Sequence, residues 1–183
     1  MASCFALLSL FLVCDVVNVV VTADDFDFQW EQCGGNSIEF IELSITPMPI
    51  RSIQDINIAF NVEADQLGSD LKLDISIKRV VDLGWFGNVR VPVPCVFDVG
   101  SCEYNMCDLI ETRIGHVCPA GDNGVCSCID KTGYFTDEIK ISLGDPSIVV
   151  SVLGSGNYEA KFTLTQGNGA VEACVKTKFS LDL

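Results

Sequence analysis

The sequence predicts an all-β protein, an antiparallel two-sheet β-sandwich or β-cup stapled by disulfides. Apolar residues recur at every second position in several stretches, which is typical of strands that are buried on one face. Clusters of Gly, Asp, Asn and Pro separate these stretches and indicate turns between the strands. The chain of 183 residues holds ten cysteines, an even number that favours disulfide bonds in a secreted protein.

Residues 1–23 contain an apolar stretch and end in Val-Thr-Ala, a small-residue pattern suited to signal peptidase. Asp15 and Asn18 interrupt this stretch, whereas the alternative, a transmembrane anchor, needs about 20 predominantly apolar residues. We therefore expect a signal peptide over residues 1–23 and a single, soluble domain over residues 24–183. Its removal would leave eight cysteines and change the formal charge from −14 to −13.

The expected strands follow the leader in chain order. The first alternates apolar with mostly polar residues, and its apolar positions are Ile56, Ile58, Phe60 and Val62. The same alternation predicts further strands at residues 71–77, 89–93, 139–143, 158–164 and 171–181. Segments rich in turn-forming residues separate several of them, namely DQLGSD, SLGDPS, GSGN and TQGNGA. Only residues 108–114 suggest a short helix.

The charge balance excludes some classes of partner. Asp and Glu number 25 against 11 Lys and Arg, and no basic stripe is visible in the sequence, which argues against nucleic acid. The same acidity argues against electrostatic attraction to anionic lipid at neutral pH.

The clustered cysteines allow three interpretations: metal ligands, redox thiols or structural bridges. Cys126 and Cys128 lie near Cys118 and the only histidine, His116, but structural zinc sites favour two to four residues between paired cysteines. No C-x-x-C motif supports redox chemistry. Eight cysteines allow 105 disulfide patterns. Because Cys126 and Cys128 would share one face of an extended strand, we expect them to bond two different upstream cysteines.

Several motifs together resemble the ganglioside GM2 activator-like proteins of the MD-2-related lipid-recognition (ML) domain family. The similarity runs from about Phe26 to about Leu181, and the cysteine string is its most specific part. The motifs are FDFQWEQC, VPVPCVFDVGSCEYNMCDLI, VCSC, GSGNY and EACVKTKFSL.

The resemblance implies a β-cup whose sheets splay apart around an apolar cavity for acyl chains. Alternation by itself fits a packed core equally well, because both arrangements require one apolar face. The resemblance also implies four disulfides, which pair Cys33 with Cys174, Cys95 with Cys102, Cys107 with Cys128, and Cys118 with Cys126.

Two segments are candidates for lipid or membrane contact. Trp85 and Phe86 lie between Gly84 and Gly87, a composition typical of a hairpin tip. Such a pair either enters the bilayer interface or folds back as a lid, and the resemblance favours membrane contact. The second segment is a buried strand or an entrance loop, and we expect it at the cavity rim; it contains Ile148, Val149, Val150, Val152 and Leu153.

No catalytic, metal or cofactor site is predicted. His116 is the only histidine, and every cysteine of the mature chain is expected to be bonded, so an activated nucleophile lacks its usual base. A pair of catalytic carboxylates is not identifiable, because their separation depends on the fold.

The resemblance implies a non-enzymatic, sphingolipid activator-like protein. It would extract a glycosphingolipid from a membrane, which it contacts peripherally, and present the headgroup to a lysosomal hexosaminidase-type glycosidase. One alternative is an extracellular lipid-sensing or immune-recognition protein, and another is a packed protein-binding module. Residence would be secreted and/or lysosomal; the absence of an N-x-Ser/Thr sequon favours secretion. In an acidic lumen near pH 4.5, Asp and Glu begin to neutralise, so we expect vesicle binding to strengthen as pH falls.

Overall fold

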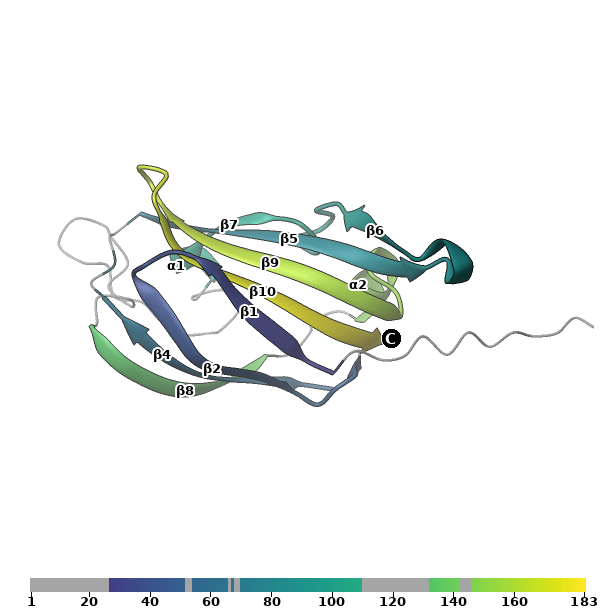
Figure 1. Ribbon diagram of the computed structural model, residues 1–183, viewed down its shortest axis with the longest axis horizontal. Coiled ribbons are helices and arrows are strands. Elements are labelled where there is room, and N and C mark those ends of the chain that lie inside the picture. The colour runs from purple at the N-terminus through teal and green to yellow at the C-terminus, as the bar shows by residue number, and fades with distance from the viewer. Residues whose placement is uncertain (1–26, 52–53, 66, 68–69, 110–131, 142–145) are drawn as a thin grey trace, which may run out of the picture.

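Two mainly antiparallel sheets face each other in the computed structural model of the chain (Figure 1). The structure describes residues 27–51, 54–65, 67, 70–109, 132–141 and 146–183. The large sheet follows the order β1 (Gln29–Gly34), β10 (Val171–Asp182), β9 (Gly156–Gln166), β5 (Leu71–Asp82) and β6 (Asn88–Val93). Two short strands extend it: β3 (Ile50–Arg51) pairs in parallel with β10, and β7 (Glu103–Asn105) pairs with β5.

The small sheet has the order β2 (Ile38–Thr46), β4 (Ile56–Ala64) and β8 (Gly133–Ile141). Within the described residues, three short helices connect strands: η1 (Gly84–Phe86) at the tip between β5 and β6, α1 (Met106–Leu109) after β7, and α2 (Pro146–Val152) before β9. None of the helices in the described part of the chain is long and apolar enough to cross a bilayer. This architecture confirms the predicted fold class.

Five of the strands predicted from alternation exist as β4, β5, β6, β9 and β10. The strand predicted at residues 139–143 is the end of the longer β8, and residues 142–143 lie outside the described part of the chain. Alternation does not predict β1, β3 or β7. Strand β2 escaped prediction because its pairing with β4 shifts register between Phe40 and Glu42, and such a bulge breaks the period of two. The predicted helix at residues 108–114 begins earlier, at Met106, and residues 110–114 lie outside the described part of the chain.

The segment expected as a buried strand or entrance loop, Ile148 to Leu153, is instead mostly helix α2. Pro146 occupies the first helical position, where its missing N–H costs nothing. The burial pattern is helical, because Val149 is buried and Ile148 and Val152 are half-buried, whereas Val150 is exposed. A run that is apolar on both faces cannot distinguish a short helix from a buried strand.

One end of the space between the sheets is filled by a packed cluster, which we call the packed end. It consists of Ile50, Ile56, Val93, Tyr158 and Leu181. Tyr158 is fully buried and stacks on Phe179 with ring centroids 5.8 Å apart. Its hydroxyl donates to the carbonyl oxygens of Leu153 and Gly154, and burial raises the pKa of Tyr158. In Figure 1 this end carries α2 and the C-terminus.

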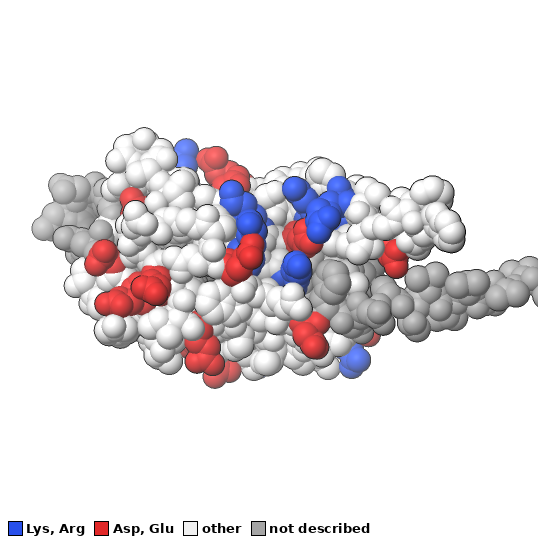
Figure 2. Space-filling model, in the orientation of Figure 1, with Lys and Arg blue, Asp and Glu red and all other residues white. Residues whose placement is uncertain are grey.

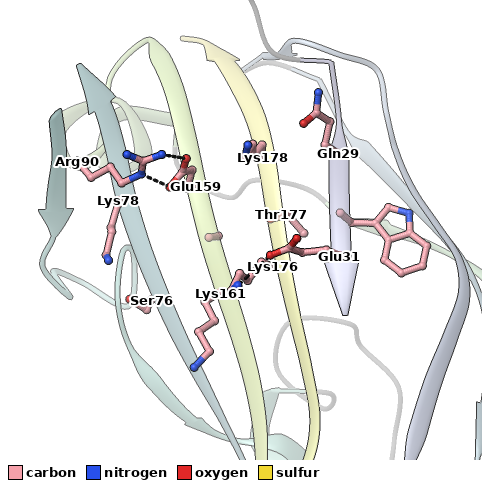
Figure 3. Close-up of a pocket in the computed structure, with 12 residues that line it drawn as sticks. Gln29, Glu31, Ser76, Lys78, Arg90, Glu159, Lys161, Lys176, Thr177 and Lys178 are labelled. Carbon is pink, nitrogen blue, oxygen red and sulfur yellow. Dashed lines mark hydrogen bonds and ion pairs between the residues drawn. The ribbon is translucent and has the colours of Figure 1, made fainter. Parts of the chain in front are cut away.

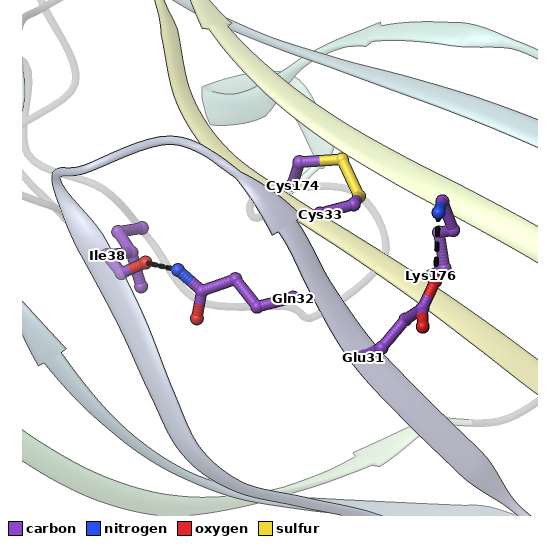
Figure 4. Close-up of a disulfide and its surroundings, with 6 residues drawn as sticks. All are labelled: Glu31, Gln32, Cys33, Ile38, Cys174 and Lys176. Atoms are coloured by element: carbon purple, nitrogen blue, oxygen red, sulfur yellow. Dashed lines mark hydrogen bonds and ion pairs between the residues drawn. A yellow bond between two sulfur atoms is a disulfide. The ribbon is translucent and has the colours of Figure 1, made fainter.

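Two disulfides lie within the described residues, and both join cysteines that the family resemblance pairs. Cys33 on β1 bonds Cys174 on β10 (Figure 4), and Cys95 bonds Cys102 in the connection from β6 to β7. The other two expected bonds, Cys107 to Cys128 and Cys118 to Cys126, fall outside what the structure describes, as does His116.

Candidate functional site

An apolar cavity of about 270 Å³ lies between the two sheets. Both sheets contribute to its wall, together with Met106 of α1. The small sheet supplies Ile38, Phe40, Leu43, Ile45 and Ile58, and the large sheet supplies Leu73, Phe162, Leu164, Ala173, Val175 and Thr177. Thr177 is the only one of these twelve residues whose side chain carries oxygen or nitrogen.

Strand alternation directs these side chains inward. On β10, Ala173, Val175 and Thr177 line the cavity, whereas Lys176 and Lys178 are exposed on the opposite face. On β2, Phe40 and Leu43 both line the cavity although three residues separate them, a spacing that in a regular strand places side chains on opposite faces. The bulge between Phe40 and Glu42 inserts one extra residue, so that the side chains on both sides of it point into the cavity. The irregularity that hid β2 from sequence analysis therefore helps to build the cavity wall.

The hydroxyl of Thr177 is isolated in this wall. The residue is only 3% exposed. Its Oγ1 atom has no hydrogen-bond partner, and it is the only buried side-chain oxygen or nitrogen of the described residues in this condition. Its neighbours in register are Trp30 on β1 and Ala160 on β9. The hydroxyl of Thr177 therefore lies just beneath an otherwise apolar surface, where a rotation about χ1 would exchange it with the methyl group and bring it to a ligand.

The outer face of the large sheet has the opposite character. Five basic side chains, Lys78, Arg90, Lys161, Lys176 and Lys178, line a groove of about 480 Å³; we call them the basic face. Figure 2 shows basic side chains gathered over the large sheet, and Figure 3 shows these five projecting from neighbouring strands. Sequence reasoning missed this face because the negative net charge of the whole chain does not show where the basic side chains gather. The alternating lysines of β10 were the available signal.

Two carboxylates partly neutralise the basic face. Arg90 donates two hydrogen bonds to Glu159, at 2.6 and 2.9 Å, and Lys176 donates to Glu31 at 2.8 Å. These hydrogen bonds, together with the positive charges of Lys176 and Arg90, hold the pKa of both glutamates below the ordinary value, although desolvation opposes the shift. Lys161 lies directly opposite Lys176 in the sheet, a like-charge pairing that is unfavourable in isolation.

Trp85 and Phe86 extend into solvent from the tip between β5 and β6, with 97% and 84% of their surfaces exposed. They do not cover the interior, so the lid arrangement is absent from this structure. Gly84 and Gly87 have φ values of 59° and 78°, which glycine adopts without strain. The exposure continues along β6 and beyond: seven of the eleven exposed large apolar residues of the described chain are Leu83, Trp85, Phe86, Val89, Val91, Val96 and Phe97.

The α2 segment does not join the cavity. Among the described residues that line the cavity, none comes from α2. Val152 and Leu153 instead pack against the packed end, and Val149 is buried. In this structure the two side chains contact the packed end, and a position of the segment at the cavity rim stays a prediction.

The cavity wall contains no group for acid–base or metal chemistry. None of its twelve residues is Asp, Glu, His, Lys or Cys. The described residues also contain no cluster of His, Cys, Asp and Glu that could hold a metal ion. What the arrangement can do is remove an apolar group from water.

Comparison with known proteins identifies one family. A family model described as ML domain matches residues 27–181. No curated protein matches the sequence. Among solved structures, a Niemann-Pick type C2 protein from Japanese carpenter ant is 15% identical, with a TM-score of 0.44, and the match covers 84% of this chain and 99% of that one. Chicken MD-1 complexed with lipid IVa is 14% identical, with a TM-score of 0.44, and the match covers 86% and 100%.

Proposed function

Because the chain belongs to the ML domain family, we propose that it binds a lipid whose apolar part enters the cavity between the two sheets. The observation that carries this proposal is the cavity wall, in which eleven of twelve side chains lack any oxygen or nitrogen. A lipid leaves a bilayer only for a comparably apolar environment, because each methylene kept from water contributes about 0.8 kcal/mol. The protein acts as a carrier, without catalysis.

The size of the cavity limits what it holds. Small-molecule sites typically measure about 300–1,000 Å³, and this cavity of about 270 Å³ lies just below that range. It therefore accommodates part of a lipid, and the polar headgroup stays outside the sheets. This division suits a protein that carries the chain and leaves the headgroup accessible.

Lipid analysis tests the proposal directly. The purified protein is mixed with vesicles, recovered free of them and extracted, and the extract is analysed by mass spectrometry. We expect lipid in stoichiometric amount, released on unfolding. A folded protein that carries no lipid from any vesicle would instead support a packed module that binds proteins.

We further propose that Trp85 and Phe86 touch the membrane during loading. Aromatic side chains favour the bilayer interface, and these two are the most exposed large apolar residues described. Vesicle co-sedimentation of a Trp85→Ala, Phe86→Ala double variant should show several-fold weaker binding than the unchanged protein. Tyr134→Ala is the control, because Tyr134 is an aromatic residue 70% exposed on β8, in the other sheet. Equal binding by both variants would exclude this role.

The finer proposal is a sphingolipid activator that lifts a glycosphingolipid and presents its sugar to a soluble glycosidase. The motif resemblance supports it. Addition of the protein to a hexosaminidase assay with membrane-bound ganglioside should accelerate cleavage, whereas a soluble substrate should be cleaved at an unchanged rate. Lipid binding without any acceleration would favour the alternative, an extracellular lipid-sensing protein.

Residence in a secreted or lysosomal compartment is also part of the proposal. Most Asp and Glu side chains begin to neutralise near pH 4.5, since their unperturbed pKa values are about 3.9 and 4.3. Lysine and arginine remain charged, so the net charge of the protein becomes less negative and the basic face attracts anionic lipid more strongly. Binding to anionic vesicles should strengthen between pH 7 and pH 4.5; a flat or reversed profile would count against action in an acidic compartment.

A further inference from the structure

The unpartnered hydroxyl of Thr177 points to the chemistry of the ligand. We infer that the lipid carries an oxygen function, such as a hydroxyl, on the part that enters the cavity, and that Thr177 Oγ1 forms a hydrogen bond with it. This inference rests on the proposed lipid-binding function. It adds a selectivity that an apolar cavity alone does not have.

The position of Thr177 directs its side chain toward the ligand space. It follows Ala173 and Val175 at alternate positions of β10, and all three line the cavity. Lys176 and Lys178, which flank it in the sequence, are exposed on the outer face. Thr177 itself is 97% buried, with 3% of its surface exposed, so bulk water does not satisfy the hydroxyl.

No protein group in the described chain serves as the partner. Oγ1 makes no hydrogen bond, and the other eleven cavity-lining side chains offer no oxygen or nitrogen. Valine has nearly the same shape and would fill this position without an unpaired polar atom, which is unfavourable when buried. The unpaired hydroxyl therefore lowers the stability of the protein until a hydrogen-bonding group of another molecule pairs with it.

Internal water is a poor candidate for that role. A buried water molecule typically makes about three hydrogen bonds and needs two to four polar partners. The cavity wall supplies one such side-chain group among its twelve residues. A ligand oxygen needs only the single partner that Thr177 provides, because the rest of the ligand packs against hydrocarbon.

The test compares fatty acids that differ by one hydroxyl group. Stearic acid and a series of monohydroxystearic acids, with the hydroxyl at different chain positions, displace a fluorescent fatty acid from the protein. A hydrogen bond to Thr177 favours one or a few positions, so the affinity relative to stearic acid should peak along the series. Thr177→Val should lower that peak about ten-fold while stearic acid binds unchanged or more tightly.

Two further variants make the result specific. Thr163→Val is the control, because Thr163 lies on the neighbouring strand β9 opposite Cys174 and does not line the cavity; it should leave the peak intact. Thr177→Ser keeps the hydroxyl and should retain the preference. A series without a peak, or a peak that Thr177→Val leaves unchanged, would overturn the inference. Failure of every fatty acid to bind would overturn the proposed function itself.

Discussion

The space between the sheets is filled at the packed end, whereas the region lined by the twelve cavity residues, which we call the hollow end, keeps an open cavity beside a second buried cluster of Leu67, Leu71, Leu164 and Ala173. Along β10 the inward positions are small at the hollow end, with Ala173, Val175 and Thr177, and larger at the packed end, with Phe179 and Leu181. Tyr158 of β9 stacks on Phe179 and completes the packed end. On β10, therefore, the size of the inward side chains, and not the alternation that all of them share, distinguishes the cavity wall from the packed end.

The packed end should account for more of the stability than the hollow end. Tyr158→Ala removes a fully buried ring from the packed cluster, and we expect it to lower the free energy of unfolding by about 3–5 kcal/mol. Tyr158→Phe keeps the ring and loses only the hydroxyl bonds to Leu153 and Gly154, so about 0.5–1.5 kcal/mol is expected. Urea unfolding measures both, and equal losses would show that the ring is not tightly packed.

One described disulfide lies beside each end, which sharpens the comparison. Cys174 sits between two cavity-lining residues of β10, and its bond to Cys33 spans 141 positions. Chain entropy predicts about 5 kcal/mol for this long closure and about 2.5 kcal/mol for the bond from Cys95 to Cys102, which spans 7 positions.

Unfolding of the two double Cys→Ala variants, each lacking one of these bonds, tests that order. Removal of Cys33 and Cys174 should cost about 2–5 kcal/mol and should exceed the cost of removing the short bridge. The opposite order would mean that native-state effects, and not chain closure, determine the contribution of each bond.

A matched pair of substitutions compares the ends with identical chemistry. Val93 belongs to the packed cluster and Val175 lines the cavity; they are 6% and 4% exposed. Val93→Phe overpacks a filled region and should cost about 1–3 kcal/mol. Val175→Phe extends into empty space and should cost less than about 1 kcal/mol. If thermal or urea unfolding gave similar losses for both, the cavity would not be the open space that the structure shows.

The outer face of the large sheet should contribute least to the free energy of unfolding. Arg90→Ala breaks the exposed ion pair with Glu159, next to Tyr158 in the sequence, and should lower the stability at pH 7 only slightly, because solvent screens the pair. Because Arg90 lowers the pKa of Glu159, this contribution is complete above the ordinary value of 4.5 and is lost as pH falls through the lowered value. The difference between the two proteins should therefore shrink below pH 4.5; a difference that grew on acidification would contradict the assignment.

Sequence reasoning succeeded where a regular pattern exists. Alternation identified six strands, and the family resemblance pairs the cysteines of both described disulfides. It missed β1, β3 and β7, as well as β2, where a bulge interrupts the period. It did not recognise α2 as a helix, since five apolar residues within six positions show no clear period.

The candidate site was only partly accessible from the sequence. The glycine neighbours of Trp85 indicated a hairpin tip and left its exposure open, whereas the cavity and the isolated hydroxyl of Thr177 depend on how two sheets meet. The small inward residues of β10 are readable in the sequence, yet they indicate a cavity only after their facing elements are known. The basic face likewise requires the register that places Lys161 opposite Lys176.

The central claim is that the hollow end is the lipid site, and ligand binding by the matched valine variants tests it most directly. The measurement is titration of a fluorescent fatty acid into the unchanged protein, Val175→Phe and Val93→Phe, each confirmed as folded. We expect Val175→Phe to lose at least about ten-fold in affinity, because the new ring fills part of the cavity of about 270 Å³. Val93→Phe should bind like the unchanged protein. Equal affinity of all three, or a loss confined to Val93→Phe, would place the lipid elsewhere and contradict the account.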